Sequence, residues 1–255
     1  ILTEMTLSLK DLHVRFTIGN TVHQYQNRDN FTANSAENAG NYLTSIQTNT
    51  NTLVIGNVEN SNILYVRIKN LSGNGDFQPL QSVLSELSQK DGIILDLRDN
   101  GGGNDGIARG FVNKITEIER TYELVRFRNG PGRNDFGDWI EAKITPDDPI
   151  TFEKPIIVLI NRGVVSSAES FVAMIKTLPN AILLGDTTRG STGNPKEFIL
   201  SNGWKYHISS WQSVTPDFEF IEDQGIAPDV VINNTEESVE EGRDLILEKA
   251  IELLE

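Results

Sequence analysis

The stretch VLINRGVVSSAESF, residues 158–171, contains an apolar strand that runs through a turn into an apolar-periodic helix. Ser166 stands at the first residue of this helix, where its hydroxyl lies beside free helical N–H groups that favour negative charge. That position suits a nucleophile whose transition state becomes an oxyanion. It also suits an ordinary N-cap, because Ser166 and Glu169 match the capping-box pattern. Taken alone, this stretch favours the cap, so the rest of the chain has to decide whether Ser166 does more.

Apolar strands alternate with helical patterns on both sides of this stretch. Strands are predicted at residues 63–68, 92–97, 156–160 and 181–184, and helices at residues 77–87 and 107–115. Such alternation predicts an α/β core in which helices cover both faces of the sheet. Functional sites in such sheets gather just beyond the strand ends, where both Ser166 and the glycine-rich loop 100–104 are expected.

The two ends of the chain are less regular. Residues 17–51 are rich in polar side chains and predict a long loop. Further expected elements are a helix over residues 1–12, strands at 14–16 and 52–55, a strand pair at 122–127 and 139–144, a hairpin around Asn202-Gly203, and a C-terminal helix at 239–254. We therefore divide the chain into an N-terminal segment, residues 1–60, and a core that includes the C-terminal helix, residues 61–255.

Composition excludes several classes of function. The 255 residues include 22 basic and 36 acidic side chains, and the net charge of −14 repels nucleic acid and anionic membranes. The absence of cysteine excludes thiol catalysis, disulfides and cysteine metal sites. The three histidines (His13, His23 and His207) have no metal-binding spacing, so we expect no metal and no other cofactor. No apolar run approaches the ~20 residues of a membrane helix. Because the chain begins at Ile1 rather than methionine, we expect a fragment of a longer protein.

A glycine-rich loop is the candidate partner of Ser166. Acyl transfer by a serine needs a base, an orienter for that base, and N–H donors for the oxyanion. The loop DLRDNGGG, residues 96–103, suits the donors, because glycines let N–H groups approach a substrate oxygen without steric hindrance. The alternative is a tight connection in which Arg98 pairs with Asp96 or Asp99, but three consecutive glycines exceed what a turn needs. The loop has neither the ending of a phosphate loop nor the glycine spacing of a dinucleotide site.

Four segments, in this order, resemble one known family: LDLRDNGGG at 95–103, NRGVVSSAE at 161–169, LGDTT at 184–188 and GIAPDV at 225–230. The family is that of the carboxyl-terminal processing peptidases, or tail-specific proteases, which also includes the tricorn core protease. The resemblance covers residues 63–232, with a further match in LKDLHV at 9–14. It implies an α/β fold related to the crotonase superfold (ClpP/crotonase-like), here with an additional N-terminal helix and strand segment. It also implies an exported serine endopeptidase, periplasmic, surface-anchored or secreted, that cleaves peptide or protein substrates.

Carried onto this chain, the resemblance places the nucleophile at Ser166. It places the oxyanion hole at the N–H groups of Ser167 and of one glycine among Gly101, Gly102 and Gly103. We choose Gly102 for this role, and we expect Gly101 and Gly103 to contact the substrate.

The resemblance also implies the base. One branch of the family uses a lysine on the loop after the next strand, but here that place is Ser191 and residues 181–195 contain no lysine, so the Ser-Lys dyad looks absent. The tricorn-like branch takes a histidine from a Leu-x-x-x-His segment near the start and a glutamate just before the Gly-x-x-Pro-Asp motif. His13 and Glu222 fall at those two places, which implies a triad with Ser166. Histidine suits the role because its unperturbed pKa of about 6.5 lets it take and return a proton near neutral pH. On its own, His13 would be a packed or solvated histidine at a helix end.

Several of these assignments have alternatives. Glu222 lies in an acidic run and could be surface charge, and Asp223 beside it could take the same role. His207 and His23 are rival bases. Arg67, at the end of an early core strand, could bind a substrate carboxylate or form a surface ion pair.

The resemblance departs from many family members in one respect. A peptide-binding PDZ domain often separates the histidine segment from the first core strand, but residues 17–60 are too polar and fewer than the ~50 of a small domain. The leading hypothesis is a serine peptidase without a PDZ domain, its oligomeric state left open. One alternative is a catalytically silent relative that binds peptide or an apolar ligand. Another is a crotonase-type acyl-CoA enzyme, for which the sequence shows no phosphate-binding basic cluster.

Overall fold

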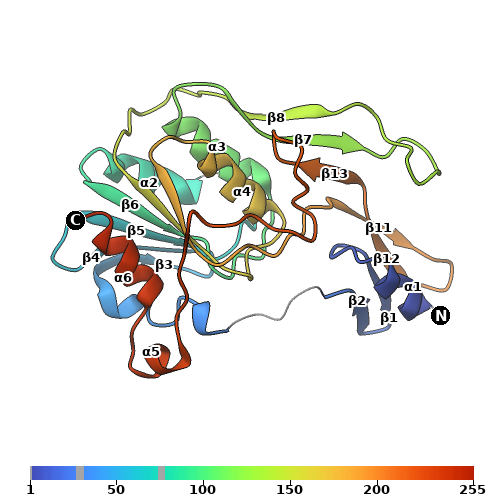
Figure 1. The fold of residues 1–255 in the computed structure, drawn as a ribbon, viewed down its shortest axis with the longest axis horizontal. Coiled ribbons are helices and arrows are strands. Elements are labelled where there is room, and N and C mark those ends of the chain that lie inside the picture. Colours follow the sequence, from blue (N-terminus) through green and yellow to red (C-terminus); the bar gives the residue numbers. More distant parts are fainter. Residues whose placement is uncertain (1, 27–31, 74–77) are drawn as a thin grey trace.

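A computed structural model describes residues 2–26, 32–73 and 78–255 and shows a seven-stranded sheet at the centre of a large lobe (Figure 1). Its strand order is β14 (Val230–Val231), β10 (Ala181–Gly185), β9 (Ile156–Ile160), β6 (Gly92–Asp96), β5 (Ile63–Ile68), β4 (Leu53–Val58) and β3 (Leu43–Asn49). Strands β14, β10, β9, β6 and β5 run parallel to one another. Strand β4 is antiparallel to β5, and β3 is antiparallel to β4. The mixed α/β architecture predicted from the sequence is therefore confirmed.

Helices cover both faces of this sheet. Successive side chains of a strand point to opposite faces, so a strand made only of apolar residues needs a cover on each side. The helices are α2 (Gln78–Leu87), α3 (Asp105–Ile115) and α4 (Ser167–Lys176) on one face and α6 (Leu245–Glu252) on the other (Figure 1). Leu95 and Val158 belong to the core beneath the first group, while Ile94 and Ile157 belong to the core beneath α6. All residues of β6 and β9 are buried, as expected for strands covered on both faces.

A smaller lobe is assembled from two distant parts of the chain (Figure 1). Its elements are α1 (Leu2–Ser8), β1 (Arg15–Ile18), β2 (Thr21–Gln24), β11 (Pro195–Ile199) and β12 (Lys205–Ser209). The strands form an antiparallel sheet of order β11-β12-β1-β2, in which Phe16 pairs with Tyr206. The sheets therefore do not follow the predicted division after residue 60, because β3 and β4 belong to the large lobe and the expected hairpin β11-β12 belongs to the small one.

Two further expectations are corrected. The predicted loop over residues 17–51 contains β2, β3 and two short 3-10 helices, Thr32–Asn34 and Ala39–Tyr42, with residues 27–31 lying outside the described part. The predicted C-terminal helix is broken into α5 (Glu236–Glu240) and α6. The break occurs because Gly242 adopts a φ of 78° and the Asp244 side chain caps α6 by accepting the Leu247 amide.

A three-stranded sheet borders the large lobe. It consists of β13 (Trp211–Val214), β7 (Arg120–Phe127) and β8 (Ile140–Ile144), so the predicted strand pair is confirmed and extended by one strand. Across the residues that the structure describes, every helix is too short or too polar to cross a bilayer.

A fully buried arginine links the central sheet to the C-terminal helix. The Arg98 guanidinium donates to Asp96 at 2.9 and 2.6 Å and to Asp244 at 2.9 and 2.8 Å. The Tyr65 hydroxyl donates to Asp96 at 2.7 Å. Burial alone would raise the pKa of Asp96, but the guanidinium holds that pKa below its usual value. Arg98 is therefore a structural residue that joins β6 to the N-terminus of α6.

Replacing Arg98 by leucine should lower the free energy of unfolding by about 3–5 kcal/mol, because the change leaves two buried carboxylates without a counter-charge. Urea denaturation followed by circular dichroism measures the loss. The matched control is Arg243→Leu, which breaks an ion pair to Glu248 whose side chains are 51% and 31% exposed. That control should cost far less, because solvent screens an exposed ion pair. Equal losses in the two variants would contradict the role assigned to Arg98.

Glu123 of β7 is a second buried charged residue, and it has few partners. Its Oε2 accepts from the Ser213 hydroxyl at 2.8 Å, whereas its Oε1 accepts no hydrogen bond from the described residues. Burial raises the pKa of Glu123 to about 7, although the hydroxyls of Ser213 and Ser170 oppose the rise. A large share of this carboxyl is therefore protonated at neutral pH.

Glu123 should make the protein less stable as the pH rises. In the unfolded chain the pKa of Glu123 returns to the ordinary value of 4.5. Below that pH the carboxyl is neutral in both states, so its burial costs no ionisation energy there. Stability should fall between about pH 4.5 and about pH 7, because the unfolded chain releases this proton first. The glutamine in Glu123→Gln cannot ionise. This variant should therefore lose about 1–3 kcal/mol less unfolding free energy than the wild type across this pH range. Urea unfolding across this pH range tests the expectation, with the exposed Glu117→Gln as control. An unchanged slope in Glu123→Gln would refute it.

Candidate active site

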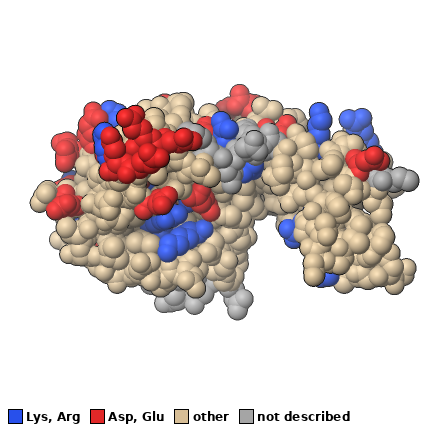
Figure 2. Space-filling model, turned by 90° about the horizontal axis from the view of Figure 1, so that it is seen from below, with Lys and Arg blue, Asp and Glu red and all other residues tan. Residues whose placement is uncertain are grey.

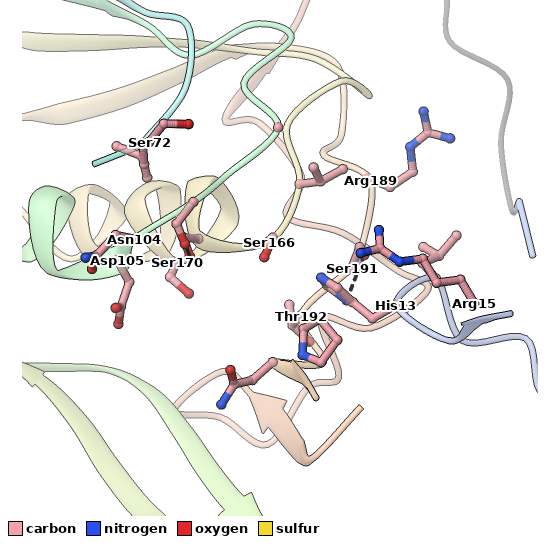
Figure 3. A pocket seen from close by; sticks show the side chains of 18 of the residues that line it. His13, Arg15, Ser72, Asn104, Asp105, Ser166, Ser170, Arg189, Ser191 and Thr192 are labelled. Atoms are coloured by element: carbon pink, nitrogen blue, oxygen red, sulfur yellow. Dashed lines mark hydrogen bonds between the residues drawn. The ribbon is translucent and has the colours of Figure 1, made fainter. Parts of the chain in front are cut away.

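Ser166 occupies a strained backbone position between β9 and α4. Its φ of 58° and ψ of −131° lie in a region that residues other than glycine rarely adopt. Its amide donates to the Ser191 carbonyl at 2.8 Å, and its own carbonyl accepts the Glu169 amide at 2.7 Å. Its side chain makes no cap hydrogen bond, and the residue lines a cleft (Figure 3). The capping-box interpretation of Ser166 and Glu169 is therefore wrong.

Glu169 is instead a buried anchor for the loop that follows β10. Its Oε1 accepts from the Thr188 hydroxyl and the Gly190 amide, and its Oε2 accepts from the Ser191 amide, each at 2.6 Å. Burial raises the pKa of Glu169 to about 7, while these three donors favour the ionised form. The loop is thus fixed against the first turn of α4, within one turn of Ser166.

The glycine-rich loop packs directly against Ser166. A Cβ on Gly102 would lie 2.9 Å from the Ser166 Cβ, so only glycine fits at this position. The Gly102 amide, our first choice for the oxyanion hole, already donates to Asn100 Oδ1 at 2.9 Å. The Ser167 hydroxyl donates to the Gly103 carbonyl at 2.8 Å. Within the described structure the amides of Gly103 and Ser167 have no acceptor, so these two donors are available beside Ser166.

His13 comes from the small lobe, between α1 and β1, and lines the same cleft as Ser166 (Figure 3). Its Nδ1 lies 3.0 Å from Ser191 Oγ and accepts the Gly193 amide at 3.0 Å. Burial lowers the pKa of His13, and Asp11 partly offsets this effect. No hydrogen bond joins His13 to Ser166 among the described contacts. Because Nδ1 is engaged, Nε2 is the nitrogen left for the cleft.

Glu222 binds backbone amides beside the histidine rather than its ring. Its Oε1 accepts the Leu12 amide at 3.3 Å, and its Oε2 accepts the Thr192 amide at 2.8 Å. Burial raises the pKa of Glu222 to about 7. Asp223, the alternative orienter, is exposed to solvent. Glu222 therefore connects the segment that carries His13 to the loop after β10.

The other sequence candidates lie away from the cleft lining. His207 contacts Arg15, their Nε2 and Nη2 atoms being 3.1 Å apart, and His23 lies on β2 facing α1. Arg67 Nη2 lies 3.7 Å from Asp99 Oδ2, so Arg67 forms the ion pair that was the alternative to binding a substrate carboxylate. Among the described histidines, His13 is the one that lines the cleft.

The cleft between the lobes has a volume of about 1000 Å³, and Figure 2 shows the two lobes separated by a notch. Figure 3 places one group of polar side chains on one side of Ser166 and a second, more basic group on the other: Ser72, Asn104, Asp105 and Ser170 in the first, and His13, Arg15, Arg189 and Thr192 in the second. The sequence analysis missed Arg15 and Arg189. Arg15 reaches the cleft because β1 pairs with β12, and no local pattern encodes that pairing. In the described part of the chain, no cluster of histidine and acidic side chains could hold a metal.

Known proteins share both the sequence pattern and the fold. The model of peptidase family S41 matches residues 62–232, more than half of the chain. The carboxy-terminal processing protease CtpA of Bacillus subtilis is 29% identical over 181 residues, which are 69% of this chain and 36% of that protein. The carboxyl-terminal-processing protease of a Synechocystis strain is 27% identical over 172 residues, 66% of this chain and 37% of that protein.

A solved structure is similar over nearly the whole chain. It is a putative peptidase from Parabacteroides merdae, with a TM-score of 0.87 and 28% identity over 99% of this chain and 81% of that one. The chain spans little more than a third of the length of the two curated relatives. The match to the family model covers the glycine-rich loop and Ser166, which line one cleft, and Glu222, which binds the amides of two cleft-lining residues. The chain therefore belongs to peptidase family S41, the family of the carboxyl-terminal processing proteases.

Proposed function

We propose that this chain is a serine peptidase that hydrolyses peptide bonds through an acyl-enzyme, with Ser166 as the nucleophile and His13 as the general base. The observation that carries the proposal is the strained backbone of Ser166. Its hydroxyl makes no helix-capping hydrogen bond, and the residue lines a cleft together with His13. Membership of family S41 supports the same reaction. The substrate is a peptide or protein that enters the cleft between the lobes. An exported location and a relation to the crotonase superfold stay predictions from the resemblance.

In the proposed reaction Ser166 Oγ attacks the scissile carbonyl carbon while His13 Nε2 takes the hydroxyl proton. The π electrons move onto the carbonyl oxygen, and the amides of Ser167 and Gly103 stabilise the resulting oxyanion. His13 then returns the proton to the amine as the C–N bond breaks. Water repeats the sequence on the acyl-enzyme and releases Ser166. The lowered pKa of His13 favours the neutral ring at neutral pH, which is the charge state that a general base requires.

Glu222 contributes to this mechanism as a positioning residue. It holds the Leu12 and Thr192 amides, which belong to the two segments that border the His13 ring. No hydrogen bond joins His13 to Ser166 among the described contacts, and catalytic hydrogen bonds are often loose before substrate binds. We infer that substrate binding brings His13 Nε2 within hydrogen-bond distance of Ser166 Oγ.

A second candidate function is peptide binding without catalysis. The observation that favours it is the Gly193 amide, which donates to His13 Nδ1 and so places the ring proton on Nε2. In that tautomer the ring has no lone pair to offer Ser166. A chain locked in this state would hold peptide in the cleft without cleaving it.

A fluorophosphonate probe should label Ser166 in the native protein, and peptide mapping by mass spectrometry identifies the adduct. Ser166→Ala should abolish labelling, and His13→Ala should slow it by about 10²–10⁴-fold, the usual contribution of a general base. His207→Ala is the matched control and should label at the wild-type rate, because His207 lies outside the cleft lining. A folded protein that binds peptide but leaves Ser166 unlabelled would favour the second candidate function.

Substitution of two glycines, one in the glycine-rich loop and one remote from the cleft, tests whether the loop must pack against Ser166. Gly102→Ala should slow labelling of Ser166 by more than about tenfold, because the new Cβ would lie 2.9 Å from the Ser166 Cβ at a φ of 84°. Gly40→Ala is the control, since its Cβ would meet nothing within 4 Å and Gly40 lies outside the cleft lining. It should keep the wild-type melting temperature and label within a few-fold of the wild-type rate. Equal rates in both variants would show that the close approach of the loop is not needed.

A further inference from the structure

Ser191 contacts both halves of the candidate site, although the proposed triad does not use its side chain. Its carbonyl accepts the Ser166 amide at 2.8 Å, and its hydroxyl oxygen lies 3.0 Å from His13 Nδ1. Its own amide donates to Glu169 at 2.6 Å, so the residue is fixed in place. Ser191 is 4% exposed, and its hydroxyl lines the cleft beside the His13 ring (Figure 3).

His13 Nδ1 needs an acceptor when the ring acts as a base. A proton taken at Nε2 produces an imidazolium that carries N–H groups on both nitrogens. The Gly193 amide is itself a donor and cannot accept the Nδ1–H. Glu222, the predicted orienter, binds backbone amides instead of the ring. Within the described residues, Ser191 Oγ is the acceptor within hydrogen-bond distance of Nδ1.

We propose that Ser191 is a positioning residue whose hydroxyl oxygen accepts the Nδ1–H of His13 and thereby leaves Nε2 free to take the Ser166 proton. In the resting state the Gly193 amide donates to Nδ1, and the ring proton is on Nε2. To reach the reacting state the ring releases the Nε2 proton to water in the cleft and takes up another on Nδ1, and the Gly193 amide no longer donates to Nδ1. The Nδ1–H is then donated to Ser191 Oγ, while the hydroxyl hydrogen of Ser191 turns into the cleft. The catalytic consequence rests on the proposed function, whereas the contact between Ser191 and His13 does not.

A hydroxyl in this place has a different effect from a carboxylate. A carboxylate bound to Nδ1 would favour the imidazolium and raise the pKa of His13, and it would be costly to bury unless well paired. A neutral hydroxyl fixes the ring without that charge, so His13 stays neutral before reaction.

The test compares the pKa of His13 in the wild type and in Ser191→Ala by ¹⁵N NMR of the imidazole nitrogens. Loss of one hydrogen bond to a charged group should lower the His13 pKa by about one to two units and slow fluorophosphonate labelling about 10–100-fold. Ser191→Thr keeps the hydroxyl and should restore both values to near wild type. Ser191→Cys, with its weak acceptor, should behave like the alanine variant and replaces it if that variant does not fold.

Ser210→Ala is the matched control, because the Ser210 hydroxyl donates to the Asn194 carbonyl at the edge of the same cleft. It should leave the His13 pKa unchanged. An unchanged His13 pKa in folded Ser191→Ala and Ser191→Cys would overturn the proposal. If even the wild type resists labelling, the peptidase function fails, while the pKa comparison still decides the role of Ser191.

Discussion

The three hydrogen bonds that Glu169 accepts are the constraint on which the site depends. They run from the Thr188 hydroxyl and from the Gly190 and Ser191 amides to one buried carboxylate on the first turn of α4. Ser166 precedes that turn and donates its own amide to Ser191. The helix that carries the nucleophile and the loop that contacts the base are therefore joined at one point. Without this carboxylate, the loop amides would be buried without acceptors.

His13 is brought to the same cleft as Ser166 by contacts between segments that lie far apart in the sequence. His13 sits on a small lobe whose sheet exists only because β1 pairs with β12 from the far end of the chain. Glu222 adds a second link, since it binds one amide beside His13 and one on the loop after β10. The cleft is thus bordered by two lobes, and hydrogen bonds of Glu222 and of the His13 ring link the small lobe to the loop after β10. Such an interface can adjust when a substrate fills the cleft, which suits a histidine that has no bond to Ser166 in the resting state.

The sequence predicted the core well because the signal there is local. Strands such as β6 and β9 are short apolar runs, and α3 and α4 have apolar residues at helical spacing. The resemblance assigned Ser166, His13 and the glycine-rich loop to one site, and the structure shows that they line one cleft, yet their roles stay proposals. The pairing of β1 with β12 could not be predicted, because both strands are short and the partners lie far apart in sequence. Glu169 was misassigned for a related reason, since its partners lie on a later loop and its spacing from Ser166 matches a cap.

The electrostatics of the site follow from carboxyls that act at a distance from the ring. Glu169 is buried and Glu222 is partly buried, and burial raises the pKa of each to about 7. Neither is hydrogen-bonded to His13, so neither holds the ring as an imidazolium by direct contact. Burial, which lowers the pKa of His13, is therefore the largest effect on its charge, and Asp11 only partly opposes it.

A neutral ring is what a general base requires, but its tautomer then depends on the neutral groups around Nδ1. Ser191 and Gly193 are those groups. The Ser191 hydroxyl can accept a hydrogen bond from Nδ1–H, whereas the Gly193 amide can only donate one to Nδ1, so their balance favours one tautomer or the other and with it the lone pair that Nε2 offers to Ser166.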